Sequence, residues 1–484
     1  MAPDTPTGGR SGRELARRAL MQAARRLIEP RVDLPLATWG LTRDEAGQLC
    51  LAGVRLGSLL ERWGSPLHVV DLGVLTANTA RFGARPGGGP GPCEVYLSYK
   101  TNPVPGVIRA VHAAGAGAEV VSAYGLWLAL RLGVDPARIV FNGPAKTEDA
   151  LALAVRSRIG LLNVNCRSEI APLARIARSE GVRVPVGIRV EVPGRPPGQF
   201  GERIAGGEAM RAYEEALAAP ELEVVAIHSH FNGEIADRGG LDAYLGALLD
   251  FEAQLRARLG LEIRILDVGG NLACPTVSRI SGRSMRLAMS LGVEPRPRPP
   301  DSVLGIEEYV AQVRARVESH CAATGRPVPR IFLEPGRALT ASAQMLLTRA
   351  IQVRDGGPDP WTWVVLDAGI NVAECLRGEW HQIFPVAERP EERVLHRLTG
   401  PSCTLGDLLV PAWSLPRLRP GDALAVMDSG AYFVPFSTDF SFPRPGIAAV
   451  GPGGPRLLRR PATFEDLVRL DEEETAADEG EGNR

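Results

Sequence analysis

Short apolar runs alternate with amphipathic stretches of roughly 10–20 residues between positions 66 and 337 of the chain. Eight of these runs have the length and composition of strands, at residues 95–99, 118–122, 139–142, 161–165, 184–190, 224–230, 264–268 and 331–333. Continuously apolar strands that are separated by helices are typical of a parallel sheet covered on both faces. Eight such units predict an α/β fold in which the strands close into a TIM-like (β/α)8 barrel.

The pattern changes after residue 340. Short β-like runs at residues 344–349, 362–367 and 423–427 lie among many glycines and prolines, which is typical of an antiparallel β-domain. A long proline-rich and arginine-rich stretch, residues 274–304, predicts an excursion from the barrel rim. The predicted organisation is a basic N-terminal extension (1–35), a lead-in segment that contributes to the β-domain (36–66), the barrel (67–340), the C-terminal antiparallel β-domain (341–460) and an acidic tail (461–484).

The two ends of the chain carry opposite charge. Residues 1–31 hold seven arginines and three acids, and an amphipathic helix is predicted over 11–28. Residues 463–484 hold nine acids and two arginines, which predicts a frayed tail. The formal charge of the whole chain is -1. The chain therefore lacks the excess of basic residues that is typical of nucleic-acid-binding proteins.

Seven cysteines are scattered without the paired spacing of a zinc site or a disulfide framework. The sequence shows neither the pattern of a signal peptide nor an apolar run of membrane-spanning length. These features predict a soluble, cytoplasmic protein that has reduced thiols and does not bind membranes.

Lysine is nearly absent from the chain. Only Lys100 and Lys146 occur, and the other 53 of the 55 basic residues are arginine. Arginine stays protonated, whereas a lysine can lose its proton when it is desolvated and then attack an aldehyde carbon. Taken alone, Lys100 is interpreted equally well as a Schiff-base lysine or as a surface lysine.

Polar residues follow several of the predicted strands at the end of the barrel where the chemistry of such barrels gathers. They are Lys100, Arg189, the pair His228 and His230, the turn 267–271, and the pair Glu334 and Arg337. The sequence offers no obvious third ligand for the histidine pair, so no metal is predicted. An amine, a glycine turn whose N–H groups can hold phosphate, an imidazole and a carboxylate together suit a phosphorylated aldehyde cofactor.

At this point the chain resembles the fold-type III pyridoxal-phosphate enzymes, which share the barrel of alanine racemase, and within them the diaminopimelate/ornithine decarboxylase family. The resemblance covers residues 36–450 and follows the order of the family's motifs. These are Gly64-Ser65-Pro66-Leu67, Tyr99-Lys100-Thr101-Asn102-Pro103, His228-Ser229-His230, Asp267-Val268-Gly269-Gly270, Glu334-Pro335-Gly336-Arg337, Gly400-Pro401-Ser402-Cys403 with Asp407, Gly430-Ala431-Tyr432 and Pro443-Arg444-Pro445.

The resemblance implies a role for each matching residue. Lys100 forms the Schiff base with pyridoxal 5'-phosphate, His230 lies against the cofactor ring, and Glu334 faces the pyridine nitrogen. Cys403 reaches the site from the second subunit of a homodimer and protonates the product. The residues implied in binding the phosphate are Gly269, Gly270, Asn271, Gly336, Arg337 and Tyr432, and those implied in lining the substrate site are Arg189, Thr404, Asp407 and Tyr432.

Three positions depart from the family's pattern. Gly233 stands where the family usually has a serine that helps to bind phosphate, and Asn271 replaces the third glycine of the phosphate turn. Thr404 replaces the acidic residue that normally holds the distal amine of a diamine or diamino acid. This last change argues against diaminopimelate, ornithine and lysine as substrates. The arginines of 274–304 either contact an acidic or larger substrate or form a solvated rim.

A carboxylate at the pyridine nitrogen keeps that nitrogen protonated, so the ring can accept the electron pair that departing CO2 leaves behind. The alanine racemase branch places an arginine there, so Glu334 favours decarboxylation. We therefore predict a pyridoxal-phosphate-dependent decarboxylase of an amino acid or an amino-acid-like conjugate. Two alternatives stay open, namely a racemase or epimerase with the same cofactor, and a catalytically decayed homologue that serves as a binding or regulatory partner.

Overall fold

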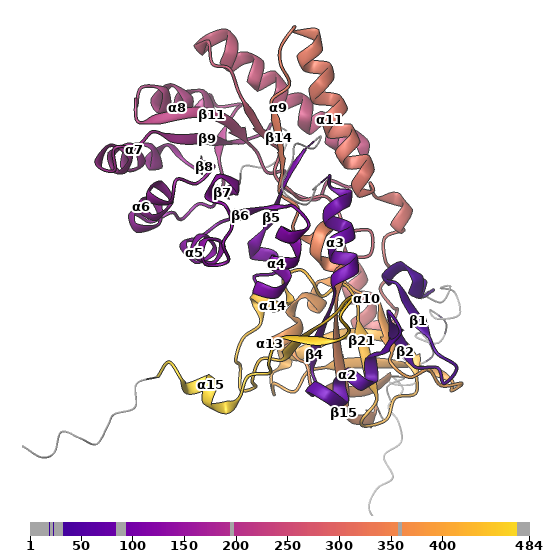
Figure 1. Cartoon of the computed structure of the whole chain (residues 1–484). Coiled ribbons are helices and arrows are strands. Elements are labelled where there is room, and N and C mark those ends of the chain that lie inside the picture. Colours follow the sequence, from indigo (N-terminus) through magenta and orange to yellow (C-terminus); the bar gives the residue numbers. More distant parts are fainter. Residues whose placement is uncertain are drawn as a thin grey trace, which may run out of the picture.

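The computed structural model describes residues 32–83, 93–193, 198–356 and 361–471, together with residues 19 and 23. Within them, eight parallel strands close into a barrel, which confirms the predicted fold class (Figure 1). The hydrogen-bonded order is β9-β11-β12-β14-β5-β6-β7-β8, and the pairing of β8 with β9 completes the ring. The strands are β5 (Glu94–Ser98), β6 (Gly117–Val120), β7 (Ile139–Phe141), β8 (Leu161–Val164), β9 (Val184–Glu191), β11 (Leu222–His228), β12 (Ile265–Asp267) and β14 (Arg330–Leu333).

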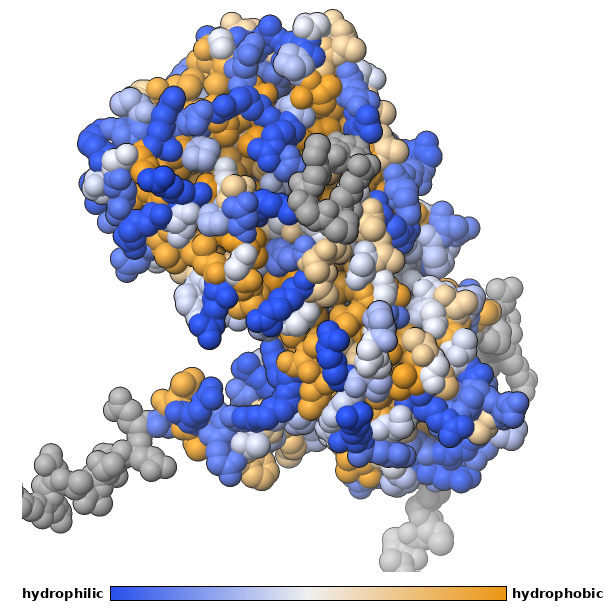
Figure 2. All heavy atoms as spheres, in the orientation of Figure 1, coloured by the Kyte–Doolittle hydropathy of each residue, from blue (hydrophilic) through white to orange (hydrophobic). Residues whose placement is uncertain are grey.

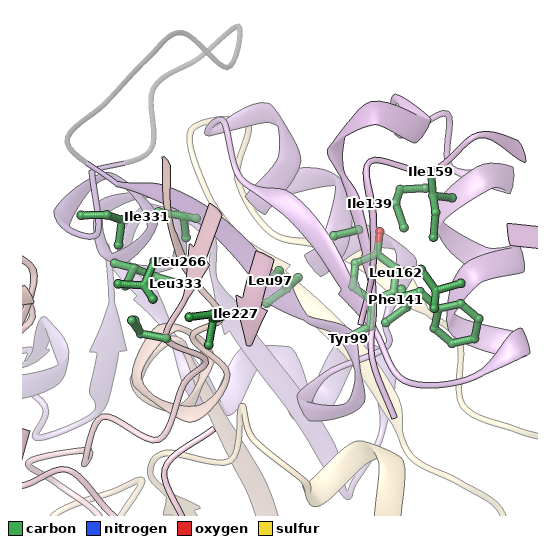
Figure 3. Packing of buried hydrophobic residues seen from close by; sticks show 14 of the residues in the cluster. Leu97, Tyr99, Ile139, Phe141, Ile159, Leu162, Ile227, Leu266, Ile331 and Leu333 are labelled. Atoms are coloured by element: carbon green, nitrogen blue, oxygen red, sulfur yellow. The ribbon is translucent and has the colours of Figure 1, made fainter. Parts of the chain in front are cut away.

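Amphipathic helices surround the barrel, as the alternating sequence pattern requires. They are α4 (Pro105–Ala113), α5 (Ala123–Arg131), α6 (Glu148–Ser157), α7 (Ile170–Ser179), α8 (Glu208–Leu217), α9 (Arg238–Leu259) and α11 (Ile306–Ala323), with α3 (Leu72–Arg81) before β5. Outward-facing strand residues such as Leu97, Phe141, Leu162 and Ile227 are fully buried in the cluster between strands and helices (Figure 3). Burial of each such side chain contributes about 1.5–3 kcal/mol. Hydrophilic residues cover much of the outer helical surface in the view of Figure 2.

The inward-facing side chains form an apolar layer low in the barrel. Tyr96, Val140, Leu161, Val225, Ala226, Ile265 and Phe332 make up this cluster. Gly117 and Gly187 face the same interior, where a Cβ on Gly117 would lie 2.6 Å from the Tyr96 ring and a Cβ on Gly187 would collide with Asn163. Because successive strand residues point to opposite faces, the next inward position on each strand lies two residues further on.

The second domain is built on a mixed, mainly antiparallel sheet with the order β20-β19-β16-β15-β4-β22-β23. Off this path β21 pairs with β15, and β18 pairs with β21. Two neighbouring pairs are parallel, β16 with β19 and β22 with β4. The strands are β4 (Leu67–Asp71), β15 (Gln344–Asp355), β16 (Trp361–Leu366), β18 (Ile383–Pro385), β19 (Arg393–Thr399), β20 (Leu408–Pro416), β21 (Ala423–Val426), β22 (Gly446–Val450) and β23 (Arg456–Arg459).

The lead-in segment packs on this second sheet. It contains η1 (Leu36–Trp39), the small sheet β1 (Leu41–Arg43), β2 (Leu49–Leu51) and β3 (Val54–Arg55), and α2 (Leu56–Trp63). Its apolar residues share one cluster with β4, β15 and β21. The prediction placed the start of the barrel at residue 67, whereas the structure pairs β4 with β15 and β22 of the second sheet. The apolar run in β4 does not by itself reveal which sheet it joins.

The excursion 274–304 is more ordered than the sequence indicated. It contains β13 (Ser278–Arg279), α10 (Gly282–Leu291) and η5 (Pro300–Ser302). β13 pairs antiparallel with β17 (Glu379–Trp380), so the excursion is fastened to the second domain. Ser281 caps α10 by accepting a hydrogen bond from the backbone N–H of Ser284.

Most of the two charged ends, including the helix predicted over 11–28, falls outside the described residues. The described part of the tail follows β23 and contains the short helix α15 (Phe464–Val468), which begins with a capping box at Thr463. Within the described ranges, no helix combines the length and the apolar character that a membrane span requires.

A glycine fixes the contact between the barrel end and the loop that follows β21. A Cβ on Gly430 would overlap the backbone carbonyl of Thr340, in the short helix α12 (Arg337–Thr340). We expect Gly430→Ala to lower the free energy of unfolding by about 3 kcal/mol or more, because a rigid backbone atom must move. Urea titration followed by tryptophan fluorescence measures this change. The matched control is Gly453→Ala, where the Cβ meets nothing within 4 Å, and an equal effect of both substitutions would contradict the packing argument.

Candidate active site

A ring of polar side chains lies directly above the apolar layer of the barrel. Each strand contributes one member, which is either in the strand or the first residue after it. This member follows by two positions the apolar or glycine residue that the same strand places in the lower layer. All members except the partly buried Arg189 are buried. The eight members are Ser98, Glu119, Asn142, Asn163, Arg189, His228, Asp267 and Glu334.

Hydrogen bonds connect this ring. The amide of Asn142 donates to Glu119 (3.0 Å) and to Glu334 (2.6 Å), and its oxygen accepts from Asn163 (2.8 Å). Asn163 also donates to Asp267 (3.1 Å). The hydroxyl of Ser98 donates to the second oxygen of Glu119 (2.6 Å). Buried carboxyl groups therefore obtain the partners that burial demands.

Glu334 is the member of the ring that faces the histidine pair. Its Oε2 lies 3.6 Å from Nε2 of His228 and 4.0 Å from Nδ1 of His230. Burial alone would raise the pKa of Glu334, but His228 and His230 outweigh it and bring the pKa below its usual range. Burial lowers the pKa of His230 to about 3, so this ring is neutral at pH 7.

The other two buried carboxyl groups behave differently. Burial, reinforced by the charge on Glu334, raises the pKa of Asp267 well above its usual value and raises that of Glu119 as well. Like charges so close together cannot all remain ionised in a dry interior. The ring thus favours one carboxylate, Glu334, with its neighbours tending to the protonated form.

Lys100 is placed by the residues on either side of it. β5 ends at Ser98 and continues into the short helix η2 (Tyr99–Thr101). The hydroxyl of Tyr99 is hydrogen-bonded to His112 on α4 (2.6 Å), and Thr101 donates to the carbonyl of Ser98 (2.7 Å). Asn102 then donates to Gln344 and to the carbonyl of Gly430 in the second domain. With its neighbours held on both sides, Lys100 projects into the site and is exposed there.

The turn after β12 lies against His230. Gly269 has φ +67°, and a Cβ there would lie 2.6 Å from the carbonyl of Ser229, so glycine is required. The backbone N–H of Gly270 donates to Nδ1 of His230 (3.3 Å). Asn271 has φ +70°, which asparagine tolerates, and its amide donates to the carbonyl of Phe231 (2.6 Å).

The motif that follows Glu334 brings an ion pair to the same region. Arg337 binds Glu379 of β17 through two parallel hydrogen bonds, of 2.7 and 2.8 Å. Glu379 also lies 3.4 Å from Nε2 of His381. The guanidinium of Arg337 lies 5.2 Å from the centre of the Tyr432 ring, and the N–H of Tyr432 donates to the carbonyl of Thr101.

Two cavities meet at these residues. One, of 740 Å³, extends over the barrel toward Arg189 and Phe200, and the other, of 650 Å³, extends past the glycine turn toward Arg337 and Tyr432. The two cavities share Lys100, His230, Asn232, Asn271 and Glu334 as lining residues. An amine, an imidazole and an ionised carboxylate therefore face one continuous space.

Cys403 lies elsewhere in the described chain. Cys403, Thr404 and Leu405 form an exposed tip between β19 and β20, and none of them lines either cavity. Asp407 is buried beneath the tip and accepts hydrogen bonds from the N–H of Ile370 (2.7 Å), from the N–H of Ser402 (2.8 Å) and from the Ser402 hydroxyl. Asp407 is thus placed to hold the tip, and contact of Thr404 or Asp407 with substrate stays a prediction.

The structure brings together most of the residues that the sequence singled out. Lys100, Arg189, His230, Glu334 and Tyr432 all line the two cavities, as do the backbone positions 269–271 and 336–337. Sequence reasoning missed Glu119, Asn142 and Asn163, which fall within predicted strands and were given no role. The signal that would have found them is a polar residue two positions beyond an apolar residue or a glycine in every barrel strand.

The sequence offered no third ligand for the histidine pair, whereas the structure brings ligand atoms of His228, His230 and Glu334 within 4.8 Å of one another. The other carboxylate oxygen of Glu334 accepts a hydrogen bond from Asn142, and Lys100 lines the same cavity. The grouping thus belongs to the candidate active site.

The residues present fit pyridoxal phosphate. An ionised buried carboxylate suits a protonated pyridine nitrogen, and an exposed lysine in the same cavity suits an aldehyde. The departure at Gly233 is accommodated by the backbone, since its φ of +128° is a conformation in which a serine would be strained. This loop therefore contributes no hydroxyl, and the phosphate would depend on the backbone at 269–271 and 336–337 and on Tyr432.

The family model described as pyridoxal-dependent decarboxylase, pyridoxal binding domain, matches residues 88–341, which include the barrel strands.

Named relatives match over most of their length. A diaminopimelate decarboxylase of Actinosynnema pretiosum subsp. auranticum is 30% identical, over 91% of this chain and 96% of the relative. A diaminopimelate decarboxylase of Aquifex aeolicus is 28% identical, over 87% of this chain and 95% of the relative. The crystal structure of diaminopimelate decarboxylase from M. jannaschii has a TM-score of 0.78 at 23% identity, covering 90% of this chain and 99% of that one, and shows the shared fold.

The buried carboxylate beneath the Cys403 tip gives a prediction on stability. Asp407→Ala removes the acceptor of the buried N–H of Ser402 and of the partly buried N–H of Ile370, and a buried group costs about 1–3 kcal/mol when it is unpaired. We expect the urea midpoint of unfolding to fall, corresponding to about 3 kcal/mol. Asp355→Ala is the matched control, because that side chain is 86% exposed. A loss below 1 kcal/mol for Asp407→Ala would show that the tip does not depend on this residue.

Proposed function

Because this chain belongs to the pyridoxal-dependent decarboxylase family, we propose that it removes the α-carboxyl group of an amino acid or an amino-acid-like conjugate. Pyridoxal 5'-phosphate is the cofactor of this family. The observation that carries the proposal is the ionised Glu334, which is buried and faces the same cavity as the exposed Lys100. When bound, the cofactor supplies an aldehyde for the amine and a ring that accepts the electron pair that departing CO2 leaves on Cα.

In this proposal each residue performs one physical task. Lys100 would supply the amine that binds the aldehyde of the cofactor. Glu334 keeps a proton on the pyridine nitrogen, and its bond from Asn142 fixes its orientation. His230 would pack against the cofactor ring, and burial keeps its imidazole neutral. The backbone at 269–271 and 336–337 and the Tyr432 hydroxyl hold the phosphate, and Arg189 lines the barrel side of the site.

Protonation of the product is assigned to Cys403 of a second copy of the chain. The tip at 403–405 is exposed and lies outside the cavities of its own subunit, so this role requires a homodimer with shared active sites. The absence of an acid at Thr404 supports a substrate other than a standard diamino acid. Diaminopimelate is the competing substrate, since the named relatives are diaminopimelate decarboxylases.

Replacement of the reactive lysine tests the assignment of the cofactor. In Lys100→Ala we expect complete loss of the visible absorbance of bound cofactor and of CO2 release. In the unmodified protein, borohydride treatment and peptide mapping should place the pyridoxyl label on Lys100. Lys146, the only other lysine, is the internal comparison, because its amine is buried in an ion pair with Glu169. A label on Lys146, or on neither lysine, would contradict the proposal.

Replacement of the buried carboxylate separates decarboxylation from the alternatives. Glu334→Gln removes the charge that holds the ring proton, and we expect CO2 release to fall about 100-fold while the cofactor stays bound. The exposed Glu318→Gln on α11 is the control and should retain full activity. A panel of amino acids, diaminopimelate and acidic or conjugated derivatives supplies the substrates. Deuterium exchange at Cα without CO2 release would indicate a racemase, and a protein that never binds the cofactor would indicate a decayed homologue.

A further inference from the structure

The two-stranded ribbon of β13 and β17 presents charged side chains to the cavity that reaches Arg337. Residues directly opposite in an antiparallel pair lie on the same face of the ribbon. One such pair is Ser278 and Trp380, which are buried, and the other is Arg279 and Glu379, which both line the 650 Å³ cavity. The backbone N–H of Ile280 donates to the carbonyl of Gly378 (2.8 Å), which extends the attachment. Arg279 is therefore fixed at this cavity by the fold of the excursion.

Six charged side chains line this cavity: Lys100, Glu234, Arg279, Glu334, Arg337 and Glu379. Lys100 and Glu334 belong to the cofactor site. Glu234 is paired with Arg298 (2.6 Å), and Arg337 is paired with Glu379 through both oxygens of the carboxylate. Glu234 and Glu379, the two acids outside the cofactor site, thus each form an ion pair with an arginine other than Arg279.

Arg279 remains without an acidic partner among the residues that the structure describes. An arginine directly opposite a glutamate would ordinarily pair with it, but Arg337 and His381 occupy the oxygens of Glu379. The guanidinium of Arg279 is exposed, and its fork of N–H donors matches the geometry of a carboxylate or phosphate. When Arg298, the partner of Glu234 from outside the lining, is counted, both acids are neutralised and Arg279 is left, among the described residues, as one unpaired positive charge at this end of the cavity.

We propose that Arg279 is a specificity-determining residue that binds an anionic group, a carboxylate, at the far end of the substrate. This rests on the proposed decarboxylase function and assigns its substrate class, an amino acid or conjugate with an acidic distal end. The same chemistry would also suit the phosphate of the cofactor. Arg279 is exposed and belongs to the excursion, whereas Gly269 and Gly270 of the phosphate turn are buried, and this favours the substrate as the source of the anion.

Three amino acids with side chains of nearly equal length test the charge preference. L-2-aminoadipate ends in a carboxylate, L-norleucine in a methyl group and L-lysine in an ammonium group. We expect kcat/KM to be highest for L-2-aminoadipate. In Arg279→Gln, the KM for L-2-aminoadipate should rise about tenfold or more, as loss of a charged hydrogen bond predicts, with kcat nearly unchanged. In Arg279→Glu the preference should invert toward L-lysine, and Arg279→Lys should restore part of the binding.

Arg283→Gln is the matched control, because Arg283 is exposed on the same excursion and lines neither cavity. Two binding measurements by calorimetry accompany the kinetics: glutarate on the cofactor-loaded protein, and pyridoxal phosphate on the cofactor-free protein. Glutarate affinity should fall about tenfold in Arg279→Gln, and pyridoxal phosphate affinity should stay the same.

These measurements distinguish failure of the Arg279 assignment from failure of the proposed decarboxylase function. A higher kcat/KM for L-lysine than for L-2-aminoadipate in the parent protein, or the same ratio after Arg279→Glu, would overturn the assignment. Loss of pyridoxal phosphate affinity in Arg279→Gln with the substrate ratio unchanged would assign the anion to the cofactor and also overturn it. If no amino acid releases CO2, the proposed decarboxylase function fails, whereas glutarate binding still decides the role of Arg279.

Discussion

The two-residue repeat of the barrel strands is the constraint on which the rest of the structure depends. Each strand places an apolar or glycine residue low in the barrel and a polar residue two positions later, at the end where the loops begin. The polar layer is buried, and hydrogen bonds among Ser98, Glu119, Asn142, Asn163, Asp267 and Glu334 satisfy much of it. The pairs are Tyr96/Ser98, Gly117/Glu119, Val140/Asn142, Leu161/Asn163, Gly187/Arg189, Ala226/His228, Ile265/Asp267 and Phe332/Glu334.

This layer decides where the negative charge lies. Three carboxyl groups in one dry space cannot all be ionised, and burial raises the pKa of Glu119 and Asp267. Glu334 alone faces two imidazoles, and Asn142 orients it from the other side. The charge therefore rests at the mouth of the barrel, within the cavity that Lys100 enters. The chemistry of the site follows from this allocation of charge more than from any single motif.

Much of the fold was predictable because parallel strands are continuously apolar on both faces and leave a strong sequence signal. All eight predicted barrel strands occur, with shifts of a few residues at their ends. The sheet that β4 joins was not predictable, because an apolar run of five residues fits either sheet. α10 was missed because its polar face and proline-rich surroundings resemble a loop. Asn142 and Asn163 were missed because a single polar residue in an apolar run does not show whether it points into the barrel.

The barrel and the β13–β17 ribbon each build one part of the site, and the ribbon is the part that can set substrate specificity. The barrel strands and the turns that follow them position the residues around the cofactor, and these turns tolerate little change, as the backbone contacts of Gly269 show. The β13–β17 ribbon instead belongs to an excursion and a domain edge, where surface loops vary readily. In this chain the ribbon supplies Glu379, which forms an ion pair with Arg337. The charge of Arg337 is therefore neutralised and does not attract an anionic ligand. A change in a few ribbon residues therefore alters the charge presented to the substrate while leaving the ring of polar groups intact.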